Sequence, residues 1–430
     1  MITISDLPKI LVISHTSFTK SDSMGSTLAS YFTGYDSDRL AQFYIKDMTP
    51  DMPVCKNYYR VTDREVFKAA LFTFSCRPVG GRIEPDFSGK QNSAAKKDTK
   101  SGNSKNRALR MIVRNTVWNL SRFTKKGFQK WVDEFSPDAV LVQPGDFGYI
   151  LKLATKISKK RRIPLIIHQS ESYYLKPYYS KRLSYLLYRL NFKRNFEKMM
   201  KRASACIYLC DALQRDYGKI FDVPSVTIYK STDIIPKAHE VADTNNGFRC
   251  IYGGNLGEAV GRAEPLCEIG KAIKKCGGVI DVYTSSKGEH LRELNDENGI
   301  VLHGAVSSDE LIKKTQHSDF VLHIENQSKE HITDLEYAFS TKIADMLACG
   351  RPAIIYGSAE IAGIKYFADN DLGLVIEKKE DLYPEIKNLV DDPERQNEYV
   401  GRAIKFAKEN HDPKKNSEKT KKLIKKVCEK

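Results

Sequence analysis

The chain has 430 residues, of which 41% are hydrophobic and 10% aromatic, and this length predicts two domains with full cores. The longest apolar runs, such as residues 165–167, have the length of a strand and fall far short of the roughly 20 apolar residues of a membrane-spanning helix; no signal peptide is visible. The nine cysteines are scattered without a C-x-x-C pair, which argues against a zinc site or a disulfide framework and predicts reduced thiols in a cytoplasmic protein.

The formal net charge of +15 is distributed unevenly. Residues 1–236 contain 40 Lys and Arg against 21 Asp and Glu, whereas residues 237–430 contain 29 against 33. Two basic runs, residues 96–130 and 176–202, carry much of the excess, and the second mixes its cations with Tyr, Leu, Phe and Met. Basic amphipathic helices adsorb to anionic lipid. A solvated helix face explains the pattern equally well, and a nucleic-acid patch is a third reading, although no nucleic-acid-binding module is recognisable.

Strands and helices alternate from the start of the chain. Residues 9–14 read as a buried strand, followed by a loop with His15 and Gly25 and by a helix through Tyr31. The next strand is expected at residues 43–45.

Residues 79–106 are rich in Gly, Ser, Lys and Asn and lack periodicity, which predicts a mobile loop inside the first domain. A single long helix should follow this loop. Its aromatic residues are Trp118, Phe123, Phe128 and Trp131.

Two further strands, at residues 139–142 and 164–167, are each followed by polar residues. Such residues at the carboxyl ends of strands are typical of ligand clefts in doubly wound sheets. They are Gln143 and Asp146 after the first strand, and His168, Ser170 and Glu171 after the second.

The second half repeats this rhythm. A strand from residue 250 runs into a glycine-rich turn that ends at Gly257, and a helix begins near Ala263. Glycines let backbone amides approach a phosphate, and Arg262 at the helix start would add a fixed positive charge. Taken alone, such a turn is more often a simple tight turn than a phosphate-binding site. Further strands are expected at residues 279–283, 301–304 and 374–376.

The most informative segment is the stretch of residues 319–356. A strand over 319–325 is followed by a polar loop and by a helix that Ser340 or Thr341 caps. Ile343, Met346 and Leu347 form its apolar stripe, and Gly350 with Pro352 ends it before a strand over 353–356. This order of elements places a ligand at the start of the helix.

The segment resembles the donor-binding segment of the retaining GT-B glycosyltransferases of the group 1 or family 4 type. Their pattern runs roughly S-K-hydrophobic-x-E-Y-L-A-x-G-x-P before a strand. The matching residues are Lys342, Leu347, Ala348, Gly350 and Pro352. Asp345 stands where the family usually has a Glu that binds the nucleotide ribose. Where the family often has a second Glu, which contacts the donor sugar, this chain has Tyr337, with Glu336 beside it and Glu325 at the strand end.

The resemblance implies a GT-B fold, in which two doubly wound Rossmann-like domains face each other across a cleft. The expected divisions are a basic acceptor domain over residues 1–236, a donor domain over 237–412 and a last basic helix over 413–430 that packs back toward the first domain. Asn410, His411, Asp412 and Asn416 are expected to precede that helix.

The resemblance also implies roles for particular residues. The expected catalytic residues are His168, Glu325 and Glu336. The expected donor-binding residues are Gly254, Asn255, Arg262, Gly304, Ser340, Thr341, Lys342 and Asp345. The expected acceptor-binding residues are His15, Gly25 and Glu171.

Transfer from a nucleotide-sugar needs charge neutralisation on the leaving diphosphate, which Lys342, Arg262 and amides at a helix start would provide. No D-x-D motif at a strand end is present to hold a divalent cation, since residues 281–283 read Asp-Val-Tyr. We therefore expect no metal ligands and no cofactor beyond the nucleotide-sugar. In the family, the configuration of the sugar is retained without a protein nucleophile.

These observations predict a cytoplasmic hexosyltransferase of polysaccharide or capsule biosynthesis, peripheral at the inner face of the plasma membrane. Its partners would be a nucleotide-sugar donor, a glycan or lipid-linked glycan acceptor and an anionic membrane surface, and no nucleic acid is expected. Two alternatives stay open. One is a GT-B-like scaffold or nucleic-acid-binding protein that has lost turnover, and the other is a sugar-nucleotide epimerase of the same fold.

Overall fold

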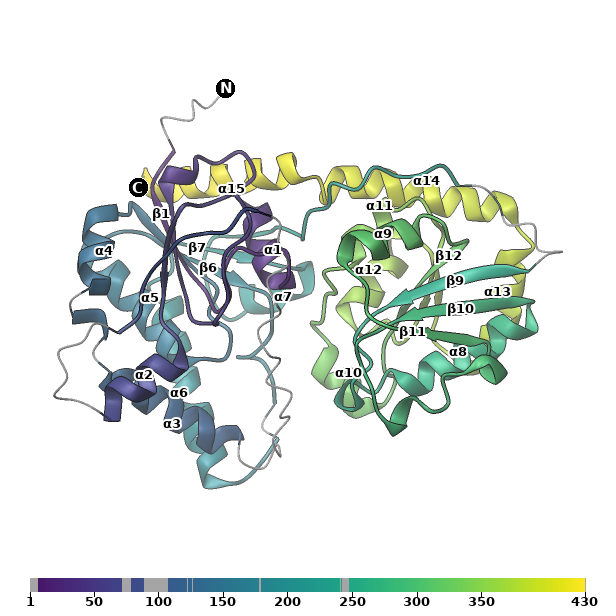
Figure 1. Cartoon of the computed structure of the whole chain (residues 1–430), viewed down its shortest axis with the longest axis horizontal. Coiled ribbons are helices and arrows are strands. Elements are labelled where there is room, and N and C mark those ends of the chain that lie inside the picture. The colour runs from purple at the N-terminus through teal and green to yellow at the C-terminus, as the bar shows by residue number, and fades with distance from the viewer. Residues whose placement is uncertain are drawn as a thin grey trace. The chain divides into compact units, whose positions relative to one another are not determined.

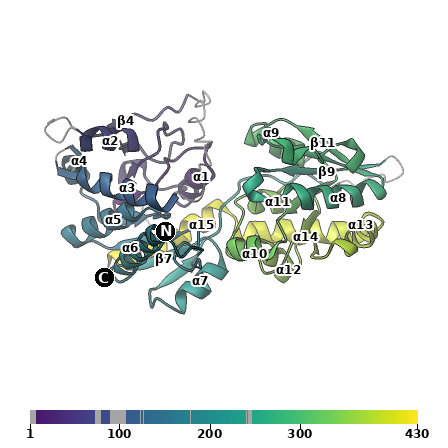
Figure 2. The same ribbon diagram turned by 90° about the horizontal axis from the view of Figure 1, so that it is seen from below.

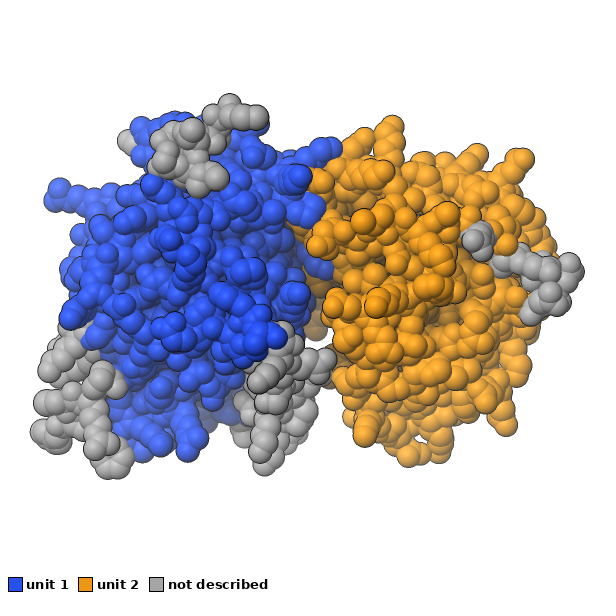
Figure 3. All heavy atoms as spheres, turned by 45° about the horizontal axis from the view of Figure 1, so that its top comes forward, with its two compact units in different colours: residues 1–230, 413–430 blue, residues 231–412 orange. Residues whose placement is uncertain are grey.

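The structure is a computed structural model that describes residues 7–71, 79–88, 107–121, 123–125, 127–177, 179–239, 241 and 247–429. The chain divides into two compact units, shown in Figure 3. Unit 1 comprises residues 1–230 together with 413–430, and unit 2 comprises residues 231–412. The last segment of the chain thus returns to the unit that the first segment forms.

Unit 1 is built on an eight-stranded sheet with the strand order β4-β3-β2-β1-β5-β6-β7-β8. Neighbouring strands are parallel except β4, which is antiparallel to β3. The strands are β1 (Ile10–Ile13), β2 (Leu40–Tyr44), β3 (Asn57–Arg60), β4 (Gly81–Ile83), β5 (Ala139–Val142), β6 (Leu165–Gln169), β7 (Ala205–Tyr208) and β8 (Ser225–Thr227). The central strands β1, β5 and β6 are buried along their whole length, because helices flank the sheet (Figure 1).

The helices of unit 1 include the last helix of the chain. They are α1 (Ser23–Ser30), α2 (Asp63–Leu71), α3 (Arg107–Leu120), α4 (Gly127–Phe135), α5 (Gly148–Arg161), α6 (Leu183–Met200), α7 (Asp211–Gly218) and α15 (Pro413–Cys428). Ile424 and Val427 of α15 are buried in the same hydrophobic core as Leu28 of α1, and the Ser417 hydroxyl donates to the carbonyl of Thr33. The helix is therefore part of the core of unit 1.

Unit 2 is built on a six-stranded parallel sheet with the order β11-β10-β9-β12-β13-β14. Its strands are β9 (Phe248–Gly253), β10 (Gly278–Tyr283), β11 (Ile300–His303), β12 (Phe320–Ile324), β13 (Ala353–Tyr356) and β14 (Leu374–Ile376). Its helices are α8 (Ala263–Lys275), α9 (Ser308–Thr315), α10 (Lys329–Leu335), α11 (Ile343–Ala348), α12 (Ala362–Asn370), α13 (Leu382–Val390) and α14 (Pro393–Asn410). Leu266, Ile269 and Ile273 recur at helical spacing on α8 and enter the core beneath the sheet.

Each sheet contains one place where the strand order reverses. In unit 1 the chain runs outward from β1 through β2 and β3 and then returns to place β5 on the other side of β1. In unit 2 it runs outward from β9 through β10 and β11 and then returns to place β12 beside β9. Ligands bind outside the carboxyl ends of the strands at such switch points, so ligand sites are expected at the carboxyl ends of β1 and β5 and of β9 and β12.

Three expectations about local structure are wrong. The predicted long helix is two helices, α3 and α4, separated by a turn of 3₁₀ helix at Phe123–Lys125. Phe123 lies in that turn because its ring packs against Trp118 and Phe128, with ring centroids 5.5 and 5.3 Å apart. Part of the predicted loop over 79–106 is the strand β4, and residues 89–106 lie outside the described residues. Asn416 lies inside α15 and does not precede it.

Figure 2 shows the ribbon from a second direction, with α15 running beside the strands and helices of unit 1. Among the residues that the structure describes, no helix is long and apolar enough to span a membrane.

Candidate functional site

A pocket lies in unit 2 at the carboxyl ends of β9 and β12, at the switch point of the sheet. Its volume is ≈ 150 Å³. This is less than the roughly 300–1,000 Å³ of pockets that enclose a whole drug-sized ligand, so it would enclose one part of a larger molecule. Its polar lining residues are Arg262, Ser308, Thr315, His323, Ser340, Lys342 and Asp345. Apolar side chains of β9, β12, α9 and α11 form the rest of the wall.

Arg262 stands at the N-cap of α8 and is held by a buried carboxylate. Its Nε and Nη2 atoms donate to the two carboxylate oxygens of Glu325, each at 2.8 Å, and Nη1 donates to the carbonyl of Asn255 at 3.4 Å. Glu325 directly follows β12, and its side chain is 3% exposed. Burial raises the pKa of Glu325, and the charges of Arg262 and Lys342 oppose that rise. Two parallel hydrogen bonds fix the guanidinium plane, so Glu325 orients Arg262 at the pocket wall.

Lys342 and Asp345 reach the pocket from the start of α11. The Lys342 ammonium donates to the carbonyl of Gly253, the last residue of β9. Asp345 lies in the first turn of the helix. Lys342 occupies the N-cap position and its own side chain does not cap the helix, but the hydroxyl of Ser340, two residues earlier, accepts from the amide of Lys342 at 3.3 Å. The chain already turns before the helix begins, as the amide of Ile343 donates to the carbonyl of Ser340 at 3.1 Å.

His323 is a lining residue that the sequence prediction missed. It lies inside β12, and its Nε2 atom is 3.6 Å from a carboxylate oxygen of Glu325. Burial, together with the charges of Arg262 and Lys342, lowers the pKa of His323 to about 3, so the imidazole is neutral. Side chains two residues apart on a strand face the same side of the sheet. The spacing of His323 and Glu325 could therefore have identified His323 as a residue of the same site.

Several predicted donor residues lie near the pocket without lining it. Gly254 follows β9, and a Cβ placed on it would lie 2.6 Å from the Tyr252 hydroxyl oxygen. Asn255 is exposed, and its side-chain oxygen accepts from the amide of Gly257 at 3.0 Å. Thr341, Gly304 and Glu336 are not among the lining residues either, and the last two are exposed. These residues therefore lie outside the pocket wall, and their role in donor binding stays a prediction.

At the β1/β5 switch point of unit 1, the loop after β1 approaches the loop after β5. The ring nitrogen Nε2 of His15 lies 3.0 Å from the carbonyl oxygen of Pro144. Asp146, two residues further, accepts a hydrogen bond from Arg107 at 2.6 Å. Burial lowers the pKa of His15. The predicted acceptor residue Glu171 is exposed and follows β6.

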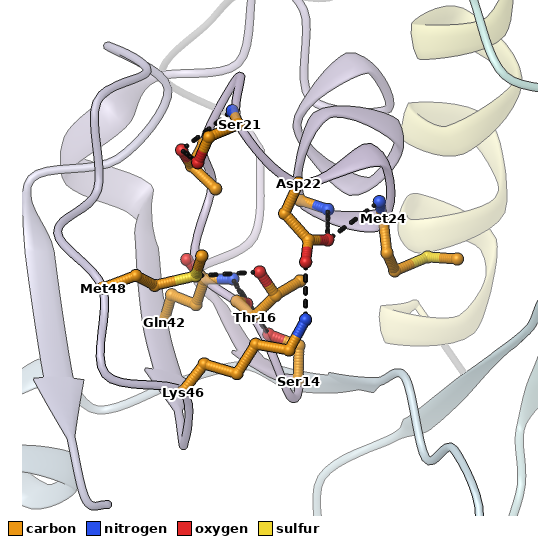
Figure 4. A network of polar contacts seen from close by, with 10 residues as sticks. Ser14, Thr16, Ser21, Asp22, Met24, Gln42, Lys46 and Met48 are labelled. Carbon is orange, nitrogen blue, oxygen red and sulfur yellow. Dashed lines mark hydrogen bonds and ion pairs between the residues drawn. The ribbon is translucent and has the colours of Figure 1, made fainter. Parts of the chain in front are cut away.

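The loop after β1 is fixed by a network of polar contacts, shown in Figure 4. The Gln42 amide donates to the Ser14 hydroxyl at 2.9 Å and to the carbonyl of Thr16 at 3.1 Å. The carboxylate of Asp22 caps α1 by accepting from the amides of Met24 and Gly25, and it pairs with Lys46. Burial alone would raise the pKa of Asp22, but Lys46 and the two amides outweigh it and lower the pKa. The network therefore sets the position of Gly25 at the start of α1.

His168 does not follow its strand, as expected, but lies within it. The strand β6 continues to Gln169, and His168 is fully buried with its Nε2 atom 3.1 Å from the hydroxyl oxygen of Tyr31. That hydroxyl donates to the carbonyl of Ile228, so the imidazole is the donor to Tyr31. Burial lowers the pKa of His168 to about 3. His168 therefore joins β6 to Tyr31 at the end of α1 inside unit 1, and its predicted catalytic role stays a prediction.

Within the described residues, no three His, Cys, Asp or Glu side chains gather in a group that would hold a metal ion.

Comparison with known proteins gives a family match and a fold match. Residues 269–421 match the sequence model of a family described as glycosyl transferase-like. No curated protein sequence matches the chain. The solved structure of HepE from Anabaena in complex with UDP aligns over 97% of this chain and 100% of its own, with a TM-score of 0.64 and 13% identity.

Two further solved structures agree with this fold. Sucrose-phosphate synthase from Thermosynechococcus elongatus aligns over 97% of this chain and 99% of its own, with a TM-score of 0.60 and 9% identity. WaaG, described as a glycosyltransferase involved in lipopolysaccharide biosynthesis, aligns over 96% and 99%, with a TM-score of 0.52 and 11% identity. The chain therefore has the GT-B fold of these glycosyltransferases, and its residues 269–421 are similar in sequence to the glycosyl transferase-like family, as the resemblance predicted.

Proposed function

We propose that this protein transfers a hexose from a nucleoside-diphosphate sugar to a glycan acceptor, with retention of configuration and without a metal ion. The observation that carries the proposal is the pocket of unit 2, where Arg262, Lys342 and Asp345 meet at the switch point of a parallel sheet. The HepE structure, which contains UDP, supports a nucleoside diphosphate as the ligand of such a pocket.

The two cations have the chemistry that the leaving group requires. A nucleoside diphosphate gains negative charge as the bond to the sugar breaks, and fixed positive groups stabilise that charge in the transition state. Arg262 is oriented by Glu325, and Lys342 is tethered to the carbonyl of Gly253, so both are positioned before a ligand arrives. The carboxylate of Asp345 would accept hydrogen bonds from the ribose hydroxyls.

Glu325 has a positioning role in this proposal. Both of its oxygens accept from Arg262, and its side chain is 3% exposed, so it acts on the donor through the arginine. The neutral imidazole of His323 lies on the same face of β12 and lines the pocket beside this pair. Neither residue needs to contact the sugar for the proposed chemistry.

The acceptor would bind at unit 1, where His15 lies in the loop after β1, Gly25 lies in the first turn of α1 and Glu171 follows β6. We propose a lipid-linked or surface glycan as the acceptor, which would place the protein in the cytoplasm at an anionic membrane surface. The association of WaaG with lipopolysaccharide biosynthesis and the net charge of +15, concentrated in residues 1–236, support this choice.

The experiment is thermal unfolding of the purified protein with UDP, GDP, ADP or CMP, each with magnesium and with a chelator. A ligand of the folded state at 100 times its dissociation constant stabilises by about 2.7 kcal/mol. One nucleoside diphosphate should raise the melting temperature equally in both conditions. Lys342→Ala should abolish the shift, because it removes one of the two cations of the pocket.

The matched control is Lys365→Ala, which removes an exposed lysine of unit 2 that pairs with Asp369 at 2.9 Å and should leave the nucleotide shift intact. A shift that survives Lys342→Ala would place the nucleotide elsewhere. The absence of a shift with all four nucleotides would support a scaffold that has lost turnover. Formation of an isomerised sugar-nucleotide from the nucleotide-sugar alone, without any acceptor, would support an epimerase.

A further inference from the structure

Helix α3 presents an apolar stripe to solvent. Leu109, Val113 and Leu120 are 53%, 49% and 57% exposed. Their spacing of four and seven residues places them on one face of the helix. Large apolar side chains in such a stripe are unusual on the surface of a monomer, where exposed leucines are normally scattered singly.

The stripe is continued on the neighbouring helix α2. α2 and α3 pack against each other, and Phe67 of α2 lines a shallow groove together with Leu109 and Val113. Phe67 and Leu71 are one helical turn apart, and their exposed fractions are 53% and 64%. The apolar surface therefore spans two helices.

A third helix adds a stripe of the same kind. Helix α6 also packs against α3, and the three helices lie together at one end of unit 1 in Figures 1 and 2. On α6, Leu183, Leu187 and Leu190 are 71%, 52% and 52% exposed at helical spacing. We call the exposed apolar residues of α2, α3 and α6 the helical patch.

Cations accompany the helical patch. Helix α3 contains three arginines and no acidic residue, and its Arg107 and Arg110 are exposed. Lys181 and Arg182 precede α6 and are exposed, and so is Arg194 near its middle. The one acidic residue of α6, Glu197, accepts a hydrogen bond from the Tyr174 hydroxyl. A surface of apolar side chains surrounded by cations is complementary to an anionic lipid bilayer, in which negatively charged headgroups cover an apolar interior.

We propose that the helical patch is the surface by which this protein binds an anionic lipid bilayer. The leucines and Phe67 enter the region between headgroups and acyl chains, and the arginines and lysines pair with the lipid phosphates. A second copy of the chain fits the patch less well, because the cations of two copies would face each other. The proposal builds on the proposed function, because it names the surface that would contact the membrane. Vesicle binding by the helical patch does not depend on the nucleotide pocket.

The experiment is co-sedimentation of the full chain with vesicles of phosphatidylcholine alone and of equal parts phosphatidylcholine and phosphatidylglycerol. The wild type should bind the anionic vesicles and bind the neutral ones much more weakly. Leu109→Ser/Val113→Ser should reduce the partition coefficient on anionic vesicles about tenfold or more, because two apolar side chains no longer leave water. Leu187→Ser/Leu190→Ser should have a similar effect, and Lys181→Glu/Arg194→Glu, which replaces two exposed cations beside the leucines of α6, should abolish the preference for anionic lipid.

The matched control is Leu302→Ser/Tyr383→Ser, which replaces two residues of unit 2 that are 42% and 45% exposed. It should bind vesicles like the wild type. All variants should keep the melting temperature and the nucleotide-induced shift of the wild type, which separates this proposal from the proposed function. Equal binding of the patch variants and the wild type would overturn it. So would a dimer of the wild type that the same substitutions dissociate, because the patch would then be an interface between copies.

Discussion

The two switch points share a topology but differ in chemistry. In unit 2, the polar groups at the carboxyl ends of β9 and β12 are Arg262, Lys342 and Asp345, and they surround a pocket. In unit 1, the loop after β1 bonds to itself and to Gln42 through Ser14 and Thr16. The parallel sheet therefore fixes where a ligand binds, whereas the segments after the strands decide whether the edge suits a charged diphosphate.

The chain offers a way to observe the units separately. Its two tryptophans, Trp118 and Trp131, are both buried in unit 1. Tryptophan fluorescence thus reports the unfolding of unit 1, whereas circular dichroism reports both units. A comparison of the two signals therefore separates effects on unit 1 from effects on unit 2.

The largest effect on stability is expected from Arg262→Ala in unit 2. The substitution leaves the carboxylate of Glu325 buried without its two donors, and breaking a buried ion pair in this way costs about 3 kcal/mol. The urea transition followed by circular dichroism should move to lower concentration.

The control for this prediction is Arg262→Met/Glu325→Leu, which removes both charges and should recover most of the lost free energy. An Arg262→Ala protein as stable as the wild type would mean that Glu325 does not depend on the arginine. Both variants should fail to bind the nucleotide.

In unit 1, Gly25→Val tests whether the loop after β1 is as fixed as its hydrogen bonds indicate. A Cβ at Gly25 would lie 2.3 Å from the carbonyl oxygen of Ser17, so the backbone must move. The free energy of unfolding followed by tryptophan fluorescence should fall by about 1–3 kcal/mol. Gly218→Ala at the end of α7, where an added Cβ meets nothing, should not lower it. An unchanged Gly25→Val protein would show that the loop is adaptable.

The effect of pH, taken for each pH unit, is expected to be smaller, and it should appear in both units. Burial lowers the pKa of His168 in unit 1 and of His323 in unit 2 to about 3. As the pH falls below about 6.5, the unfolded chain gains a proton on each imidazole while the folded chain does not. Stability should therefore fall by about 1.4 kcal/mol per pH unit for each histidine until the pH approaches the folded pKa.

The measurement is the free energy of unfolding at several pH values between about 6.5 and 4.5. His168→Gln should flatten the dependence seen by tryptophan fluorescence, whatever its effect on absolute stability. Replacing the exposed His317 by Gln should leave both curves unchanged. A His168→Gln protein with the pH dependence of the wild type would show that other groups cause it.

The smallest effect is expected for Lys365→Ala. Lys365 and Asp369 are both about half exposed and pair across one helical turn of α12, so the substitution should change stability by less than about 0.5 kcal/mol. A larger loss, or one that persists in high salt, would show that exposed pairs matter more in unit 2 than solvent screening allows.

The alternation of strands and helices was predictable because parallel strands buried on both faces read as short apolar runs, as β5 and β13 do. The start of α8 at Ala263 and the pocket residues Lys342 and Asp345 were also predictable, from the helix signals and the resemblance. Buried strands, helix starts and motif residues are all marked by local sequence patterns, which a single sequence displays.

The partners of the site residues were not predictable. Arg262 and Glu325 are 63 residues apart in the chain, and only the pairing of β9 with β12 brings them together. The burial of His168 depends on Tyr31 of another segment, which gives the imidazole a partner inside the core. The break between α3 and α4 depends on how Phe123 packs against other aromatic rings. These outcomes arise from tertiary contacts, which a single sequence does not display.

The position of α15 has a consequence for how the protein is made. Unit 1 needs Ile424 and Val427 in its core, yet the ribosome adds them only after all of unit 2. Domains generally fold as units during synthesis. Residues 1–230 therefore have part of their hydrophobic core exposed until α15 is synthesised. Unit 2, which is continuous in sequence, can complete its fold before that. The last helix is thus the step that closes unit 1, and the interval before it emerges is when the chain is most exposed to aggregation.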